Sequence, residues 1–340
     1  MGDFLALGQE SKLVAVVGKV RQDAGHLIAA LSPLRSISDL ASVPGPVFLA
    51  IGVFDGVHLG HRAVIERAMA DARDAGGSTV VVTFDPHPVR VLRPERAPHL
   101  LTSTPHKLRL IRALGVAHIL VIPFDAAFAA TPPDVFIRQL AAAAKPLREI
   151  CVGHQWSFGK GRAGNLEMLD LLGTELGFDE VGVPAVEIGG RIVSSTLIRQ
   201  GVETGDLADA ARLLGRDYTI LGTVIEGRKL GRTIGFPTAN LAAHNEQFPP
   251  NGVYAVEVLR NGDAPRFGVA NIGVRPTVAE AGGERMLEVH IFDFDGSLYG
   301  TDLEISFRQF LRPELKFPSI EALRAQIARD AKAAREVFSP

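Results

Sequence analysis

The sequence predicts two domains of different class: a doubly wound α/β domain, then a small antiparallel β-barrel with a C-terminal helix. Three observations lead to this prediction. Up to about residue 200, short apolar runs alternate with amphipathic helical stretches, as in parallel sheets covered by helices. After residue 217, short alternating strands are separated by dipeptides that favour tight turns. A length of 340 residues also suits about two domains.

The first half carries the alternation of strands and helices. We predict strands at 47–51, 79–84, 117–122, 149–153 and 181–187, and helices at 61–75, 105–114, 132–144 and 165–176. The run Thr79–Phe84 is of the continuous β-branched kind that a parallel sheet buries on both faces. Thr131 is expected to cap the third helix, with Pro132 in its first position. Right-handed crossovers would place the carboxyl ends of the strands, and the ligand, along one edge.

The second half changes to hairpins after a short helix at 206–214. Strands are predicted at 218–225, 253–259, 266–272, 286–293 and 302–307, with turn dipeptides at 251–252, 261–262, 282–283 and 295–296. The alternation in Leu287–Ile291 places Glu288 and His290 on one face and the aliphatic side chains on the other. Pro318 is expected to open a long amphipathic helix that ends near Val337.

These patterns suggest the following domain boundaries. Residues 1–35 form an extension with no chemistry that the sequence identifies. The first domain covers residues 38–200, a linker covers 201–217, and the second domain covers 218–340.

Composition excludes several classes of function. Lys+Arg 36 against Asp+Glu 38 gives a formal charge of −2, without the basic footprint of a nucleic-acid binder. The single cysteine, Cys151, excludes an internal disulfide framework and fits a reducing compartment. No apolar run approaches the roughly 20 residues of a membrane helix, and Leu13–Val17 is too short for the core of a signal peptide. We therefore expect a cytoplasmic protein with no nucleic-acid or membrane partner.

The segment 52–61 (GVFDGVHLGH) follows a buried strand and opens a helix. Its glycines allow the backbone to approach a ligand closely, and His58 and His61 flank Gly60 at the helix start. Free N–H groups and the helix dipole make that position an anion site. Two histidines there could neutralise the charge that builds on a phosphate as pyrophosphate leaves. The alternatives are a pair that only caps the helix, or a zinc site, for which the neighbouring residues do not offer the further ligands.

Two other segments fit the same site. TFDPHP (83–88) follows the second strand and places Asp85 at the crevice. In SSTLIR, Ser195 and Thr196 offer hydroxyls, and Arg199 offers a fork of donors that suits phosphate oxygens. An ordinary N-cap is the alternative role for the two hydroxyls.

Together these motifs resemble a known family. GVFDGVHLGH, TFDPHP, FGKGRAG and SSTLIR, in that order, resemble the nucleotidyltransferase module of the bacterial bifunctional riboflavin kinase/FAD synthetase family. The second half resembles the kinase module of that family in five motifs, at 222–227, 231–241, 251–254, 271–277 and 287–290. The resemblance covers about residues 38–340. It implies a Rossmann-like first domain that transfers the adenylyl group of ATP to FMN, giving FAD and pyrophosphate, and a barrel that phosphorylates riboflavin to FMN.

The resemblance also implies roles for residues of the first module. His58 and His61 would hold the phosphates of ATP and stabilise the transition state. Asp85 would lie at the flavin. The pocket for the nucleotide would be shaped by Gly52, Phe54, Asp55 and Gly60. The triphosphate would be clamped by Arg162, Ser195, Thr196 and Arg199.

In the kinase module, Glu288 is the candidate base for the 5′-hydroxyl of riboflavin. Thr238 and Asn240 lie two residues apart, which points both side chains the same way in an extended segment, and both offer the oxygen ligands that Mg²⁺ prefers. Arg275 and Arg312 resemble positions near the flavin. The expected ATP contacts of this module are Gly222, Thr223, Gly227, Gly231 and Pro237.

One departure from the family pattern concerns 153–159 (GHQWSFG), where Gln155 and Trp156 replace the usual Asp-Phe. Aromatic bulk survives but a negative charge is lost. We interpret the change as neutral. The alternatives are a riboflavin kinase with weakened or lost FAD synthesis, or a flavin-binding regulator without turnover. A transfer-RNA-charging enzyme is disfavoured, because the lysine-rich signature loop and an anticodon-binding domain are not recognisable.

Overall fold

The computed structural model describes residues 32–227, 231, 234–260, 262–275 and 284–339. The chain divides into two compact units, of which the first comprises residues up to 97 together with 107–185. The second comprises residues 98–106 and 186–340. Most of the predicted extension 1–35 and the turn at 282–283 lie outside the described residues, as does Asn261 of another predicted turn.

The first unit contains a five-stranded parallel sheet in the order β3-β2-β1-β4-β5. Its strands are β1 (Val47–Ile51), β2 (Ser78–Asp85), β3 (His118–Pro123), β4 (Leu147–Gly153) and β5 (Asp179–Val183). From β1, the order continues through β2 and β3 on one side and through β4 and β5 on the other. The carboxyl edge next to β1 is therefore the switch point at which such sheets bind ligands.

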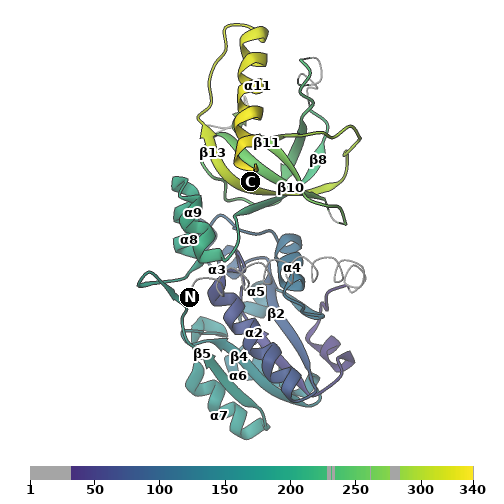
Figure 1. Cartoon of the computed structure of the whole chain (residues 1–340). Helices are drawn as coiled ribbons and strands as arrows, with labels where there is room; N and C mark the ends of the chain where they lie inside the picture. Colours follow the sequence, from purple (N-terminus) through teal and green to yellow (C-terminus); the bar gives the residue numbers. More distant parts are fainter. Residues whose placement is uncertain (1–31, 228–230, 232–233, 261, 276–283, 340) are drawn as a thin grey trace, which may run out of the picture. The chain divides into compact units, whose positions relative to one another are not determined.

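Helices cover both faces of this sheet, as predicted for a doubly wound domain (Figure 1). On one face, α2 (Leu59–Asp74) and α4 (Thr104–Ala113) pack on alternate strand residues such as Ala50 and Val81. On the other, η2 (Ile37–Ser42), α6 (Pro133–Ala143) and α7 (Leu166–Leu176) pack on the residues in between, such as Leu49 and Val82. The described part of the unit also contains the short helices α3 (Pro88–Leu92), η3 (Pro94–Arg96), α5 (Ala126–Ala129) and η4 (Lys160–Arg162).

Three details of the first unit differ from expectation. Helix α6 begins at Pro133, and its N-cap position is Pro132, so Thr131 does not cap it. The predicted strand 181–187 ends at Val183, because Pro184 lacks the N–H that a ladder needs. Leu34 pairs with Leu120 beside β3, so the end of the predicted extension belongs to the fold.

The second unit is built on a closed barrel in the order β10-β11-β12-β9-β8-β13, which confirms the predicted barrel. Its strands are β8 (Thr219–Ile225), β9 (Ala239–Ala243), β10 (Gly252–Arg260), β11 (Arg266–Arg275), β12 (Glu284–Ile291) and β13 (Asp302–Arg312). Strand β9 was not anticipated, because it has only five residues and follows directly on Pro237 and Thr238. Leu287 and Val289 point into the barrel, so Glu288 lies on its outer face, as the alternation predicts.

Helix α11 (Ile320–Val337) packs on β10, β11 and β13, and Ser319, rather than Pro318, forms its N-cap (Figure 1). The predicted linker 201–217 is largely helical. Helix α8 (Ser195–Thr204) was not predicted, and α9 (Leu207–Leu214) follows it after Gly205. A two-stranded ribbon of β6 (Glu187–Ile188) and β7 (Arg191–Ile192) precedes them.

Residues 98–106 come from the first half of the chain but are built into the second unit. The Leu100 N–H donates to Glu246 Oε2 at 3.1 Å, and the Leu100 carbonyl accepts from the N–H groups of Glu246 and Gln247. His106 is fully buried, with Nδ1 3.2 Å from Asn245 Oδ1 and Nε2 3.0 Å from Thr219 Oγ1. The barrel is therefore joined to a segment that precedes it in sequence by more than a hundred residues.

Candidate active sites

The turn after β1 has an unusual backbone. Phe54 and Val57 have positive φ angles of 55° and 41°, which are costly for side chains of their kind, and Gly56 between them has φ 83°. The Phe54 ring is buried beneath Gly52, where a Cβ atom would lie 2.8 Å from the ring. Gly52 and Phe54 thus shape the turn together, and their contact with a nucleotide stays a prediction.

His58 and His61 lie together at the start of α2. His58 is the N-cap residue, and its Nδ1 accepts the backbone N–H of His61 at 3.3 Å, which leaves the proton of the neutral ring on Nε2. The two rings stack with centroids 3.5 Å apart, and Phe54 meets His61 edge-on at 5.3 Å. The capping alternative is therefore true of His58.

The electrostatics of His61 favour a neutral ring. Burial, and then the charges of His58 and Lys107, hold the pKa of His61 well below its ordinary value. Its Nδ1 is buried and has no hydrogen-bond partner among the residues that the structure describes. A phosphate brought to this helix start would offer such a partner, and its negative charge would raise the pKa of His61.

Lys107 of α4 is a residue that the sequence analysis missed. Its side chain is buried, and Nζ donates to the carbonyl oxygens of Val53 at 3.1 Å and Phe84 at 3.3 Å. Burial lowers the pKa of Lys107 to about 8, against the opposing effect of the Asp55 and Asp85 charges. A signal was present: Lys107 is four residues before Ile111, which puts a lysine on the apolar face of the helix.

Other predicted contacts of the first module are distributed over both units. Arg162, in the first, is exposed with φ 58° and donates from Nε to Ser157 Oγ at 2.7 Å. Helix α8, in the second, begins with Ser195 and Thr196 and is capped by Ser194, not by either of them. Arg199 of the same helix donates to the His99 carbonyl at 2.8 Å. The clamp of Arg162, Ser195, Thr196 and Arg199 on one triphosphate stays a prediction.

The departure at Gln155 and Trp156 lies just after β4. Gln155 is exposed, whereas Trp156 stacks on Phe158 with ring centroids 4.3 Å apart. The Phe158 ring belongs to a row of aromatic contacts that continues through Phe136, Phe128, Phe124 and Phe84, next to Asp85. The tryptophan is thus part of the packing, and the lost carboxylate concerns a surface position.

The second constellation lies on the outer face of the barrel. Glu288 of β12 is directly opposite Asn240 of β9 on one side and Asn271 of β11 on the other. Residues paired in this way project from the same face, with Cβ atoms about 4.5–5.5 Å apart. The barrel therefore brings Asn240 and Glu288 together and adds Asn271, the first residue of the motif at 271–277.

Glycines lie against these side chains. A Cβ atom at Gly227 would collide with Asn240 Nδ2, and one at Gly231 would collide with the Phe236 carbonyl oxygen and lie 3.2 Å from Thr238 Oγ1. Only glycine fits such approaches. The Nδ1–H of His290 donates to the Pro237 carbonyl at 2.8 Å, which fixes the backbone just before Thr238. The glycine-rich segment, Thr238 and Asn240 thus form one cradle with hard oxygen donors, which fits Mg²⁺.

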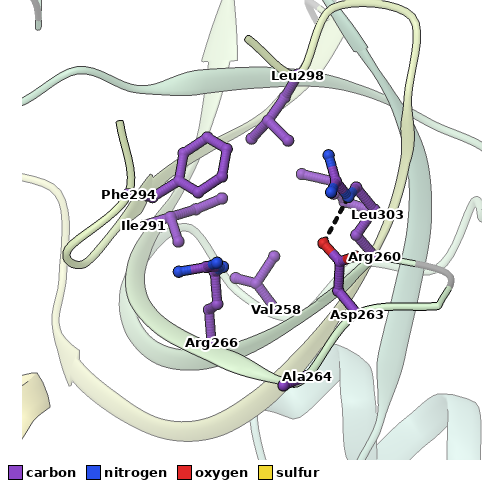
Figure 2. A pocket seen from close by; sticks show the side chains of 9 residues that line it. All are labelled: Val258, Arg260, Asp263, Ala264, Arg266, Ile291, Phe294, Leu298 and Leu303. Carbon is purple, nitrogen blue, oxygen red and sulfur yellow. Dashed lines mark hydrogen bonds and ion pairs between the residues drawn. The ribbon is translucent and has the colours of Figure 1, made fainter. Parts of the chain in front are cut away.

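A cleft of about 280 Å³ adjoins this cradle. Its lining includes Glu226, Asn240, Phe248, Arg285 and Met286. Figure 2 shows a different hollow, inside the barrel near Leu298 and Phe294, of about 10 Å³. That volume holds about one water molecule and excludes a substrate.

Three predicted kinase residues have other partners. The Thr223 hydroxyl donates to Asp302 Oδ1 at 2.7 Å and lies 2.9 Å from His244 Nε2. Arg312 forms a two-pronged ion pair with Asp330 of α11, with N–O distances of 2.7–3.1 Å. Gly222 packs against the β9 backbone. Arg275 is the last residue of β11 and pairs with Glu284. The structure describes its backbone but not its side chain. Their contacts with ATP or flavin stay predictions.

A parallel α/β unit with paired histidines at a helix N-terminus, and a separate barrel with an oxygen-lined, glycine-rich cradle, define a two-module enzyme of phosphate chemistry. Models of two families match the chain: FAD synthetase over residues 41–197 and riboflavin kinase over residues 214–338. The chain belongs to the family of bifunctional riboflavin kinases/FMN adenylyltransferases.

Curated relatives carry that description over nearly their whole length. The Escherichia coli K12 protein is 42% identical over 306 residues, covering 90% of this chain and 97% of its own. Those of Listeria monocytogenes and Haemophilus influenzae are 40% and 38% identical, each covering 86% of this chain and 92% and 94% of their own.

A solved structure from Streptococcus pneumoniae, described as a macrolide-efflux protein, has a TM-score of 0.76 and 29% sequence identity. It covers 89% of this chain and 98% of its own. Among the described residues of this chain, no helix has the length and apolar character needed to cross a membrane.

Proposed function

We propose that the two modules act in sequence, the barrel phosphorylating riboflavin to FMN and the α/β unit converting FMN to FAD, with the residues below in named roles. In the barrel, the Glu288 carboxylate takes the proton of the riboflavin 5′-hydroxyl as its oxygen attacks the γ-phosphorus of ATP, and ADP leaves. The position of Glu288 opposite Asn240 supports this role, because it puts a base beside the cradle for the phosphates.

Mg²⁺ is part of the proposal. Thr238 and Asn240 would hold it, and when bound it supplies positive charge to the phosphates of ATP. The close approach of Gly227 and Gly231 supports the role of the same segment in covering the phosphates, because a side chain at either position would fill the space. Pro237, whose carbonyl is held by His290, fixes the start of the segment.

In the α/β unit, a phosphate oxygen of FMN attacks the α-phosphorus of ATP in line, and pyrophosphate leaves. His58 and His61 donate to phosphate oxygens and stabilise the negative charge that grows there. Their stacked arrangement at the N-terminus of α2 supports this, since helix N–H groups and ring N–H groups then converge on one anion. A cytoplasmic location belongs to the proposal and is supported by a lone buried thiol, Cys151.

The observation that carries the kinase assignment is the register of β9, β12 and β11, which aligns Asn240, Glu288 and Asn271 on one face. The test is a two-product assay with riboflavin, ATP and Mg²⁺, in which FMN and FAD are separated and quantified over time. FMN appearing first and FAD following supports the proposal. If FMN forms without FAD, the function is limited to the kinase. If neither FMN nor FAD forms, the proposal is overturned.

A further inference from the structure

The turn before His58 has a backbone conformation that is unfavourable on its own. Phe54 and Val57 are both in the left-handed region, and Val57 is β-branched. Such conformations persist only where surrounding contacts determine them more strongly than the local backbone does. The contacts that fix this turn therefore decide where His58 and His61 stand.

The carbonyl group of Val53, immediately before the turn, is held by two donors. Thr83 Oγ1 of β2 donates to it at 3.0 Å, and Lys107 Nζ of α4 donates to it at 3.1 Å. Lys107 also donates to the Phe84 carbonyl at 3.3 Å. One ammonium group thus links the carboxyl ends of β1 and β2, the edge at which this class of sheet binds its ligand.

Packing alone does not explain a lysine at this position. The side chain is 5% exposed, and an apolar residue of similar length would fill the same space without the cost of burying a charge. Burial lowers its pKa, while the charges of Asp55 and Asp85 partly maintain the ammonium form. The positive charge in turn contributes to the low pKa of His61, after burial and His58.

We propose that Lys107 is a positioning residue for adenylyl transfer: its ammonium group fixes the Val53 and Phe84 carbonyls, so that the strained turn presents His58 and His61 to the nucleotide phosphates. The inference rests on the proposed adenylyl transfer, and it assigns Lys107 no direct contact with substrate. It acts through the turn and through the charge that it places beside His61.

The test compares Lys107→Met with Thr83→Val in the full chain. Both variants remove a donor to the same Val53 carbonyl, but only Lys107→Met removes the charge. We expect Lys107→Met to lower kcat for FAD formation from FMN by about 10²-fold, as expected for misplaced catalytic groups. Formation of FMN from riboflavin, measured on the same samples, is the control and stays unchanged.

A second readout separates positioning from general destabilisation. NMR titration of ¹³C-labelled histidine, with His61 assigned from the His61→Asn spectrum, reports the pKa of His61 without any turnover. Lys107→Met should raise that pKa because a neighbouring positive charge is gone, whereas Thr83→Val should leave it in place. Lys107→Arg, which keeps the charge, should keep the pKa low and recover part of the lost rate.

Several results would overturn the inference. These are full FAD formation by Lys107→Met, an unshifted His61 titration in that variant, or a Lys107→Arg enzyme as slow as Lys107→Met. If Lys107→Met does not fold, Lys107→Gln takes its place with the same expectations. A wild-type chain that forms no FAD would instead refute the proposed function, and the His61 titration would then still show whether the charge of Lys107 lowers the pKa of His61.

Discussion

Glu288 and Asn240 face each other across the antiparallel pair of β12 and β9, on the outside of the barrel. Asn240 is in turn covered by Gly227, where any Cβ would collide with its amide nitrogen. Glu288 and Asn240 are therefore held in place by the backbone hydrogen bonds of two paired strands. Such a site keeps its geometry when a side chain is exchanged, which makes substitutions informative about chemistry.

Replacing Glu288 by Gln should remove the proposed base of the kinase reaction without changing the shape of the site. We expect FMN formation to fall by about 10²–10⁴-fold, the usual contribution of a general base. Conversion of added FMN to FAD should be unchanged, because it uses the other module. Measuring both products from one preparation checks this. An enzyme that still forms FMN at the wild-type rate would remove Glu288 from the mechanism.

Replacing His58 or His61 by Ala should impair FAD formation and spare FMN formation. In the proposed reaction each ring contributes a donor to the growing negative charge, and loss of one such donor costs about 10²–10³-fold in rate. FAD formation should fall by that factor, while FMN formation continues. Glu66→Gln, on the exposed side of the same helix, is the matched control and should leave both rates intact. Equal loss in the control would mean that the helix, not the histidines, was damaged.

The departure at Gln155 allows a direct test of whether the family's carboxylate matters here. Gln155→Asp restores the usual residue at an exposed position. We expect FAD formation to stay close to the wild-type rate, because the interpretation of the change as neutral gives this exposed residue no part in the reaction. Steady-state kinetics with FMN and ATP measure it. A gain of about tenfold or more, near 1.4 kcal/mol, would show that this chain has a weakened adenylyltransferase.

Much of the fold and of the candidate site could be predicted from the sequence, for reasons that particular residues show. β1 was predicted with the observed bounds because Val47–Ile51 is a short apolar run that ends at glycine. His58 and His61 could be found because their spacing and the preceding strand are local features of the chain. Lys107 could not, because its proposed role depends on Val53 and Phe84, which are separated from it by 54 and 23 residues. The place of residues 98–106 in the second unit could not be predicted for the same reason, because they pair with residues near 246.

Asp330 should be important for the stability of the second unit. It forms an ion pair with Arg312, a residue that the resemblance places near the flavin. Arg312 and Asp330 are largely buried, with side chains 16% and 6% exposed, and Gln326 also donates to Asp330. Asp330→Ala leaves the guanidinium without its partner and should cost about 3 kcal/mol, as for other buried pairs broken on one side. Denaturant unfolding measures the change. Asp293→Ala removes an exposed ion pair to the same helix and should leave the stability unchanged.

Acid should weaken the second unit through Glu304. Burial alone would raise the pKa of this carboxyl, but the hydrogen bond and charge of His106, with the charge of Arg216, lower it below its ordinary value. His106 Nε2 lies 3.5 Å from Glu304 Oε1. A carboxylate whose pKa is lowered by folding stabilises the protein above its unfolded pKa, and that stability is lost as pH falls through the folded value.

The melting temperature of the second unit should therefore gain no slope from Glu304 between pH 7 and about 5, and should decrease as the pH falls below about 4.5, the ordinary pKa of the carboxyl, toward its folded value; calorimetry can measure this. Glu304→Gln cannot be ionised, so its melting temperature should depend less on pH over the same range, although it is lower at pH 7. Glu336→Gln, at an exposed glutamate of α11, should keep the wild-type slope. A Glu304→Gln protein with the wild-type slope would mean that the acid sensitivity originates elsewhere in the barrel.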